Sequence, residues 1–198
     1  TRAEESGESL ARELRAAGLE VECWPLVRLA PAALETVRPV LEHLGDYDWI
    51  FLPSPSAVRL VAGQMAQLGV AWPPGARAGL VGPSSVEAFR ACFGTAPAVD
   101  SPDRPPPEAA RLAAGLAAPP RRALVLNRPD GRLYWLEVLR AACVFVLVVP
   151  AYAAEALEQP PGPALLAALE AAREQGGTVA WVVGAASQLD TLLRCIPA

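Results

Sequence analysis

The chain has 198 residues, 53% of them hydrophobic, which is enough for one large domain or two small ones. No window of about 18 consecutive residues is apolar throughout, and no basic segment leads into an apolar one at the start, so we expect no membrane partner and no signal peptide. The net charge is −4 and all 17 basic residues are arginines that form no stripe, so we expect no nucleic-acid partner.

The chain contains four cysteines and one histidine, His43. The cysteines form no C-x-x-C pair, which excludes the common zinc sites, and we expect no metal. Cys23 and Cys143 lie in apolar runs, where a free cysteine behaves as a small hydrophobic residue, and this favours a reduced, cytoplasmic protein. His43 lies at a predicted helix end without a Ser-His-Asp pattern, so we do not expect a hydrolase triad.

The N-terminal part predicts helix, strand, connector and helix in turn. Residues 1–17 end in an apolar helical pattern, and Gly18 suits the position that follows a helix. Residues 19–25 alternate apolar and polar side chains, which predicts a strand. Residues 27–31 predict an extended connector, and residues 32–43 a second helix.

A first strand–turn–helix corner carries two serines. Residues 47–52 predict a strand, the turn contains Ser54 and Ser56, and a helix is expected over 56–68. Backbone N–H groups at a helix N-terminus and small hydroxyls suit an anion. An ordinary βα turn with a serine cap is the alternative interpretation.

A second corner of the same kind follows. Residues 76–81 predict a strand and residues 86–92 a helix, and the turn between them contains Gly82, Ser84 and Ser85.

The rest of the chain continues the alternation. We expect a loop over residues 99–107, a helix over 107–117, a strand over 122–127 and a turn over 128–132. A helix over 133–142 and a strand over 144–149 come next. The last expected elements are a helix over 164–175, a strand over 178–183 and a helix over 187–195. The run 144–149 is apolar throughout, which is typical of a strand in the middle of a parallel sheet. The order predicts an α/β fold with parallel sheets flanked by helices.

The two halves of the chain resemble each other. Residues 14–25 align with 139–150, and residues 49–61 align with 180–192, which puts Ser187 opposite Ser56. Two unrelated α/β segments can also look alike. The preserved order of elements nevertheless predicts two similar α/β domains, with a cleft between them as the ligand site.

Five short motifs occur in an order that is typical of one family. They are Thr1-Arg2, Asp48-Trp49 followed by Pro53-Ser54-Pro55-Ser56-Ala57-Val58, Val81-Gly82-Pro83-Ser84-Ser85, Arg128-Pro129-Asp130-Gly131-Arg132, and Tyr152. With these motifs the chain resembles the uroporphyrinogen-III synthase family over nearly its whole length.

The chain departs from the family pattern at several of these positions. Pro53 and Ser56 stand where the family usually has Thr and Asn, and Pro129 replaces a Gly. Gly184 and Ala185 stand where the second serine-bearing corner often has Thr-Ser. Both ends look short beside the family.

The resemblance implies two domains joined by a two-stranded connector, with a cleft between them. The first would comprise residues 1–30 and 155–198, with its C-terminal part short, and the second residues 35–150. The connectors would be residues 27–34 and 150–158.

The resemblance also implies a lyase that cyclises hydroxymethylbilane, with inversion of ring D, to uroporphyrinogen III in haem biosynthesis, without a cofactor. Tyr152 would be the catalytic residue, and a hinge-packing aromatic is the alternative for it. The substrate-binding residues would be Arg2, Ser54, Ser56, Gly82, Ser84, Ser85, Arg128, Gly131, Arg132 and Ser187. Solvated turn arginines are the alternative for the arginines. We expect a monomer that receives its substrate from hydroxymethylbilane synthase.

Two other functions stay open. A non-catalytic relative of the same fold would bind a tetrapyrrole or a protein partner, and the changes at Pro53, Gly184 and Ala185 favour it. A periplasmic-type two-domain binder of small molecules would need an export signal.

Overall fold

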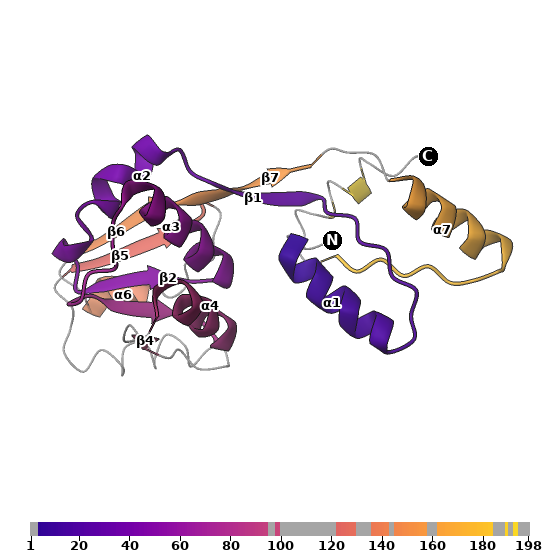
Figure 1. Ribbon diagram of the computed structural model, residues 1–198, viewed down its shortest axis with the longest axis horizontal. Helices are drawn as coiled ribbons and strands as arrows, with labels where there is room; N and C mark the ends of the chain where they lie inside the picture. The colour runs from indigo at the N-terminus through magenta and orange to yellow at the C-terminus, as the bar shows by residue number, and fades with distance from the viewer. Residues whose placement is uncertain are drawn as a thin grey trace. The chain divides into compact units, whose positions relative to one another are not determined.

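The structure is a computed structural model with two compact units. It describes residues 4–94, 98–99, 122–129, 136–142, 145–157, 162–183, 189 and 192–193. Unit 1 comprises Thr1–Leu29 and Ala154–Ala198, and unit 2 comprises Ala30–Ala153 (Figure 1). The units are described one at a time below.

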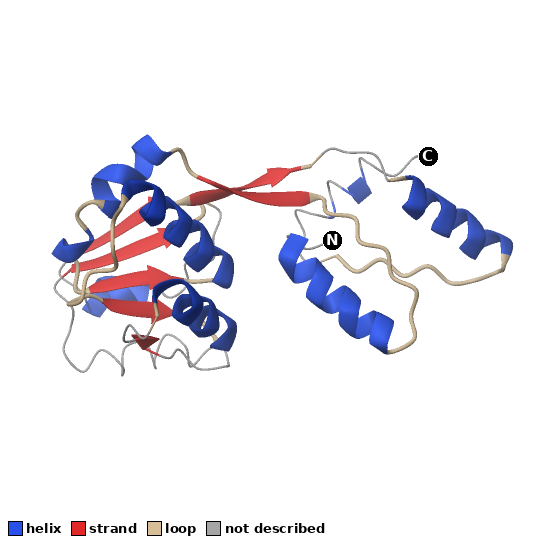
Figure 2. Ribbon diagram, in the orientation of Figure 1, coloured by secondary structure: helices blue, strands red, loops and turns tan. Residues whose placement is uncertain are grey.

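Unit 2 contains a parallel five-stranded sheet (Figure 2). Its strands are β2 (Trp49–Leu52), β3 (Arg77–Leu80), β4 (Ala98–Val99), β5 (Arg122–Asn127) and β6 (Phe145–Pro150). Their spatial order is β4-β3-β2-β5-β6. All four neighbouring pairs are parallel. The predicted α/β fold with a parallel sheet is therefore confirmed.

Helices flank this sheet. They are α2 (Leu34–Leu41), α3 (Pro55–Leu68), α4 (Pro83–Phe93) and α6 (Leu136–Ala142), and a short 3₁₀ helix covers Leu44–Asp46. Leu136 and Leu139 of α6 pack against Trp49, Phe51 and Val125 on one face of the sheet. In Figure 2, α3 and α4 lie in front of the sheet and α6 lies behind it.

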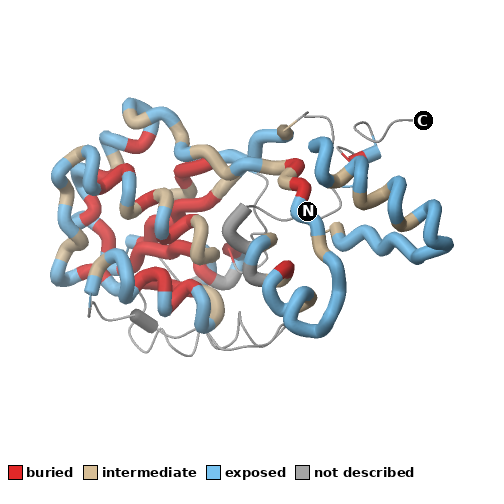
Figure 3. The backbone as a smooth tube through the Cα atoms, turned by 45° about the vertical axis from the view of Figure 1, so that its right-hand side comes forward, coloured by how far each residue is buried: buried red, intermediate tan, exposed pale blue. Residues whose placement is uncertain are grey.

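The core of unit 2 follows the strands. Strand β2 is buried at every residue and β5 at every residue after Arg122. Figure 3 shows the buried residues gathered in the interior of unit 2. Burial on both faces is what helices on both sides of a parallel sheet require. The predicted helix over residues 107–117 lies outside the described residues.

The position predicted for the apolar run 144–149 is wrong. Residues 145–149 of the run lie in β6, which among the described strands is at the edge of the sheet, and Phe145 is 45% exposed. The guanidinium of Arg122 lies 5.3 Å from the centre of the Phe145 ring. An apolar run indicates burial, whereas the place of a strand in a sheet depends on the crossover connections, which the run does not encode.

Strands β1 (Val27–Pro31) and β7 (Tyr152–Ala156) form a separate two-stranded sheet. Leu157 N donates to Leu26 O, and Ala32 N donates to Ala151 O, each at 2.9 Å. From Leu26 to Ala32 along one strand, the bonded residue of the other strand goes back from Leu157 to Ala151, so the two strands run antiparallel. Arg28 forms an exposed ion pair with Glu155 at 2.6 Å. The boundary between the two units crosses both strands.

Unit 1 contains helices α1 (Glu4–Ala16) and α7 (Pro163–Glu174). Gly18 follows α1 with a φ of 86°, as the sequence predicts, and Leu19 N donates to Leu14 O. Trp24 and Leu26 are buried together with Leu192.

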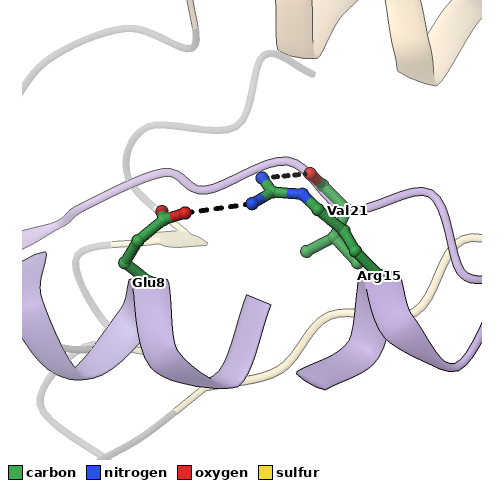
Figure 4. A network of polar contacts seen from close by, with 3 residues as sticks. All are labelled: Glu8, Arg15 and Val21. Carbon is green, nitrogen blue, oxygen red and sulfur yellow. Dashed lines mark hydrogen bonds and ion pairs between the residues drawn. The ribbon is translucent and has the colours of Figure 1, made fainter. Parts of the chain in front are cut away.

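The strands predicted at residues 19–25 and 178–183 are wrong, because both segments are irregular. A strand needs a hydrogen-bonded neighbour, and alternation alone supplies none. Leu19 stays 55% exposed. Instead of a ladder, the Arg15 guanidinium donates to the Val21 carbonyl at 2.9 Å and to Glu8 at 3.0 Å (Figure 4).

Candidate active site

Tyr152 is buried in unit 2, and its hydroxyl lies between two polar side chains. The residue is 4% exposed. Its Oη lies 3.2 Å from Ser54 Oγ and 3.5 Å from Asn127 Oδ1. Ser54 follows β2, Asn127 ends β5 and Tyr152 begins β7. The fold therefore brings together three residues that are far apart in the sequence.

Ser54 is held in place by its role as the cap of α3. Its Oγ accepts a hydrogen bond from Ala57 N at 3.0 Å, and its backbone oxygen accepts one from Val58 N at 3.1 Å. Pro55 occupies the first helical position, where a free N–H is not needed. Because the cap bond fixes the side chain, Ser54 presents its hydroxyl to Tyr152 in a defined position.

The hydrogen bonds form a directed chain. An amide oxygen can only accept, so Tyr152 Oη donates to Asn127 Oδ1. By distance either oxygen of the Ser54–Tyr152 pair can donate, and with the Tyr152 proton on Asn127 it is the Ser54 hydroxyl that donates to Tyr152 Oη, while Ser54 Oγ accepts from Ala57 N. The bond from Tyr152 to Asn127 is the long one, and such a length makes a weak hydrogen bond. The Tyr152 proton is thus directed away from Ser54 and only weakly held.

The backbone next to Tyr152 is fixed by a second set of bonds. Ala151 N donates to Asn127 O at 2.8 Å, and Ala151 O accepts from Ala32 N at 2.9 Å. The buried side chain of Gln64 on α3 donates from Nε2 to Ala151 O at 3.2 Å and to Ala32 O at 3.0 Å. Helix α3 thus meets Tyr152 in two places, through the Ser54 cap at the hydroxyl and through Gln64 at the backbone of the preceding residue.

The second corner follows β3. Gly82 precedes α4 with a φ of 76°, a conformation that favours glycine. Ser85 is fully buried, and its hydroxyl donates to Val81 O at 2.7 Å. Ser84 is exposed in the first turn of α4. In this corner the Ser84 hydroxyl is therefore open to a ligand, and the Ser85 hydroxyl has a structural partner.

Arg128 directly follows β5 and is half-buried. Among the described residues it forms no ion pair. Ser56, in the first turn of α3, is also half-buried. Four other predicted site residues, Arg2, Gly131, Arg132 and Ser187, lie outside the described residues, as do Gly184 and Ala185.

Asn127 is the polar neighbour of Tyr152 that the sequence motifs do not single out. One signal for it was available, because Asn127 is the polar residue at the carboxyl end of an otherwise apolar strand. Ligand-binding residues of open parallel sheets gather at that end of the strands.

The described residues contain no group of three His, Cys, Asp or Glu side chains that could hold a metal ion. Within the same residues, no helix has the length and the apolar composition needed to span a membrane.

Comparisons with known proteins agree with the fold. A solved structure of a mutant uroporphyrinogen III synthase from the extremely thermophilic bacterium Thermus thermophilus matches with a TM-score of 0.55 and 18% identity, over 96% of this chain and 72% of the other. A second structure of the Thermus thermophilus enzyme matches with a TM-score of 0.50 and 20% identity, over 98% and 74%. No curated protein matches the chain.

These likenesses define an α/β protein with the uroporphyrinogen III synthase fold. The sequence model of uroporphyrinogen-III synthase HemD matches residues 8–198. The chain belongs to the uroporphyrinogen-III synthase family, which confirms the family predicted from the motifs. Family membership supports the predicted function as an enzyme of haem biosynthesis.

Proposed function

We propose that this chain cyclises hydroxymethylbilane to uroporphyrinogen III and that Tyr152 is the group that assists loss of the terminal hydroxyl. The supporting observation is the position of the Tyr152 hydroxyl, which is buried beside Ser54 in a chain of this family. The reaction class is that of a lyase, and the proposal includes no cofactor.

The first step is elimination of water. Tyr152 Oη–H donates its proton to the terminal hydroxyl of the substrate, the C–O bond breaks, and water leaves. The pyrrole electrons then form a cationic azafulvene. The Ser54 hydroxyl donates to the oxygen of Tyr152 while the proton is away, which stabilises the developing negative charge. A positioned acid of this kind contributes roughly 10²–10⁴-fold to the rate.

The remaining steps need orientation more than additional chemical groups. The azafulvene carbon bonds to the ring D α carbon that already carries the methylene bridge to ring C, which gives a spiro intermediate. That bridge bond then breaks and leaves an azafulvene on ring C, whose methylene carbon bonds to the free α carbon of ring D. Loss of the proton from this carbon restores the aromatic pyrrole, and the proton returns the tyrosine to its starting state. Holding the two ends of the chain close together lowers the barrier by removing their relative freedom.

The carboxylates of the substrate are proposed to meet Arg128, Ser56, Gly82 and Ser84, with Arg2, Gly131, Arg132 and Ser187 as further members of the set. Ser54 and Ser85 belong to it as well, and each would have to turn its O–H from its present partner, Tyr152 Oη or Val81 O, to a carboxylate oxygen. Backbone donors at α3 are few, because Pro55 has no N–H and Ala57 N already donates to Ser54.

The wider organisation is also part of the proposal. It comprises two α/β domains at residues 1–30 with 155–198 and at 35–150, two connecting strands, and a cleft that takes the substrate. We also propose that the protein is a cytoplasmic monomer and that it receives hydroxymethylbilane from hydroxymethylbilane synthase. The location of the unit boundary inside β1 and β7 supports this division.

A coupled assay tests the function. Hydroxymethylbilane is generated in situ with and without the chain, and the oxidised uroporphyrin isomers are separated. We expect an excess of type III over the spontaneous type I isomer. Type I alone, from a chain shown to be folded, would support the non-catalytic relative, which binds a tetrapyrrole without converting it.

A further inference from the structure

We propose that Asn127 is a positioning residue that orients the hydroxyl of Tyr152; as a statement about catalysis, this rests on the proposed function. Asn127 is 3% exposed and ends a strand whose four preceding residues are apolar and fully buried. An amide in such a place calls for an explanation, because buried polar groups are expensive unless they are paired.

The Asn127 side chain is only partly paired. Its Nδ2 has no hydrogen-bond partner among the described residues, although it is buried. Leaving a buried donor unpaired destabilises a fold more than replacing it with an apolar group of similar shape. The one hydrogen bond of this side chain in the described structure is the one that Oδ1 accepts from Tyr152. Within the described residues, the contact with Tyr152 is therefore the one polar role of this side chain.

The acceptor decides which way the tyrosine proton points. Ser54 Oγ is the other described oxygen within reach of Tyr152 Oη, and without Asn127 the proton can turn toward it. Ser54 would then have two donors facing it, from Ala57 N and from Tyr152. With Asn127 present the O–H of Tyr152 points along a long, weak hydrogen bond of 3.5 Å, in which a substrate oxygen can replace the amide oxygen as the acceptor.

The variant Asn127→Leu removes this acceptor and leaves the rest of the site in place. The backbone oxygen of residue 127 still accepts from Ala151 N, since that bond does not involve the side chain. Val125→Ala is the matched control, because Val125 lies two residues earlier on the same strand and is fully buried in the core. It loses packing without changing a polar group near Tyr152. Asn127→Ala serves as a second variant if leucine does not fit.

The first measurement does not depend on turnover. The chain has three tyrosines, so labelling them with ¹³C at Cζ gives three signals, and Tyr152→Phe identifies the signal of Tyr152. We expect Asn127→Leu to shift this signal and Val125→Ala to leave it in place. An unchanged Tyr152 signal in folded Asn127→Leu and Asn127→Ala would overturn the proposal.

The second measurement is a double-mutant cycle on kcat. We expect Asn127→Leu to lower kcat roughly threefold to tenfold with little change in KM, which corresponds to loss of one hydrogen bond. In the Tyr152→Phe background the same substitution should have no further effect, because Asn127 acts through the missing hydroxyl. Equal losses in both backgrounds would overturn the proposal. If the wild-type chain forms no type III isomer, the proposed function fails, and the NMR result alone decides whether Asn127 orients the hydroxyl.

Discussion

At the scale of single residues, the chain of hydrogen bonds from Ala57 through Ser54 to Tyr152 and Asn127 determines what Tyr152 can do. Each hydroxyl in it donates once and accepts once. The tyrosine ring is packed in the interior, but its proton is held only by the weak bond to Asn127. Because the ring is fixed and the hydrogen bond to Asn127 is long, a substrate oxygen can take the place of Asn127 as the acceptor of the Tyr152 hydroxyl.

Replacing Tyr152 with Phe tests that role directly. Tyr152→Phe removes only the hydroxyl, so we expect a loss of kcat of about 10²-fold or more and a nearly unchanged melting temperature. Tyr47→Phe is the control, because Tyr47 is also buried but lies at the other end of the sheet, beside Arg122. The rate of type III formation is measured for both variants. Full turnover by Tyr152→Phe would leave Tyr152 as a packing residue.

Gly79 shows how close the packing is within the sheet. It pairs with Phe51 of the neighbouring strand, and a Cβ atom at Gly79 would overlap the Phe51 ring. That ring cannot easily move, because Phe51 is 2% exposed and stacks on Trp49. Glycine is therefore required here by space and not by backbone conformation.

We expect Gly79→Ala to lower the free energy of unfolding by roughly 1–3 kcal/mol, as overpacking typically does. Gly63→Ala is the matched control, since Gly63 lies inside α3 with open space around its Cα. There alanine should stabilise the helix by roughly 0.5–1 kcal/mol. Denaturant unfolding of both variants measures the difference. Equal midpoints for the two would contradict this account of the sheet.

At the scale of elements, helix α3 links the site to the two-stranded sheet. Ser54 caps its first turn. Gln64 in its third turn donates to the backbone oxygens of Ala32 and Ala151, which lie next to β1 and β7. A shift of α3 would therefore move Ser54 and the Tyr152 backbone together.

Gln64→Leu tests this link. We expect loss of both side-chain bonds to lower the free energy of unfolding by about 1–2 kcal/mol and to speed exchange of the Ala32 amide proton roughly tenfold. Gln67→Leu changes an exposed glutamine on the same helix and should have little effect on either quantity. Hydrogen exchange followed by NMR gives the comparison. Unchanged protection of Ala32 in Gln64→Leu would show that Gln64 does not hold the connector.

At the scale of the whole molecule, the described parts of the two units differ in how much of their backbone pairs in strands. Unit 2 contains the parallel sheet, whereas in the described part of unit 1 the segments 19–25 and 178–183 pair with no strand. Trp181 and Val182 are 41% and 51% exposed. Amides that bond to water exchange quickly, and amides in a buried sheet exchange only on larger opening.

We therefore expect hydrogen exchange of the full chain to proceed in two groups. Amides of residues 19–25 and 178–183 should exchange within the earliest time points, and amides of β2 and β5 should exchange last. Mass spectrometry of peptic peptides measures both groups in one experiment. Strong protection of residues 19–25 would show a strand ladder that the structure lacks.

Much of the local structure is predictable from the sequence. The bounds of β5 match the predicted strand, and α3 begins within one residue of the predicted helix, because an apolar run, a Pro/Ser turn and a helical pattern are local signals. Gly18 takes the left-handed conformation expected of it. The failures are non-local. Residues 19–25 have the alternation of a strand but no partner, and β6 has the composition of a central strand but lies at an edge.

The same division holds at the candidate site. The sequence by itself determined the family, the α/β class with a parallel sheet, and Ser54 and Tyr152 as separate candidates, because these depend on motifs and local periodicity. Only the tertiary structure decided that Ser54, Asn127 and Tyr152 meet at one hydroxyl. Their proximity arises from the crossovers that put β2 beside β5 and from the return of the chain through β7, and contacts between such distant segments leave no local pattern in the sequence.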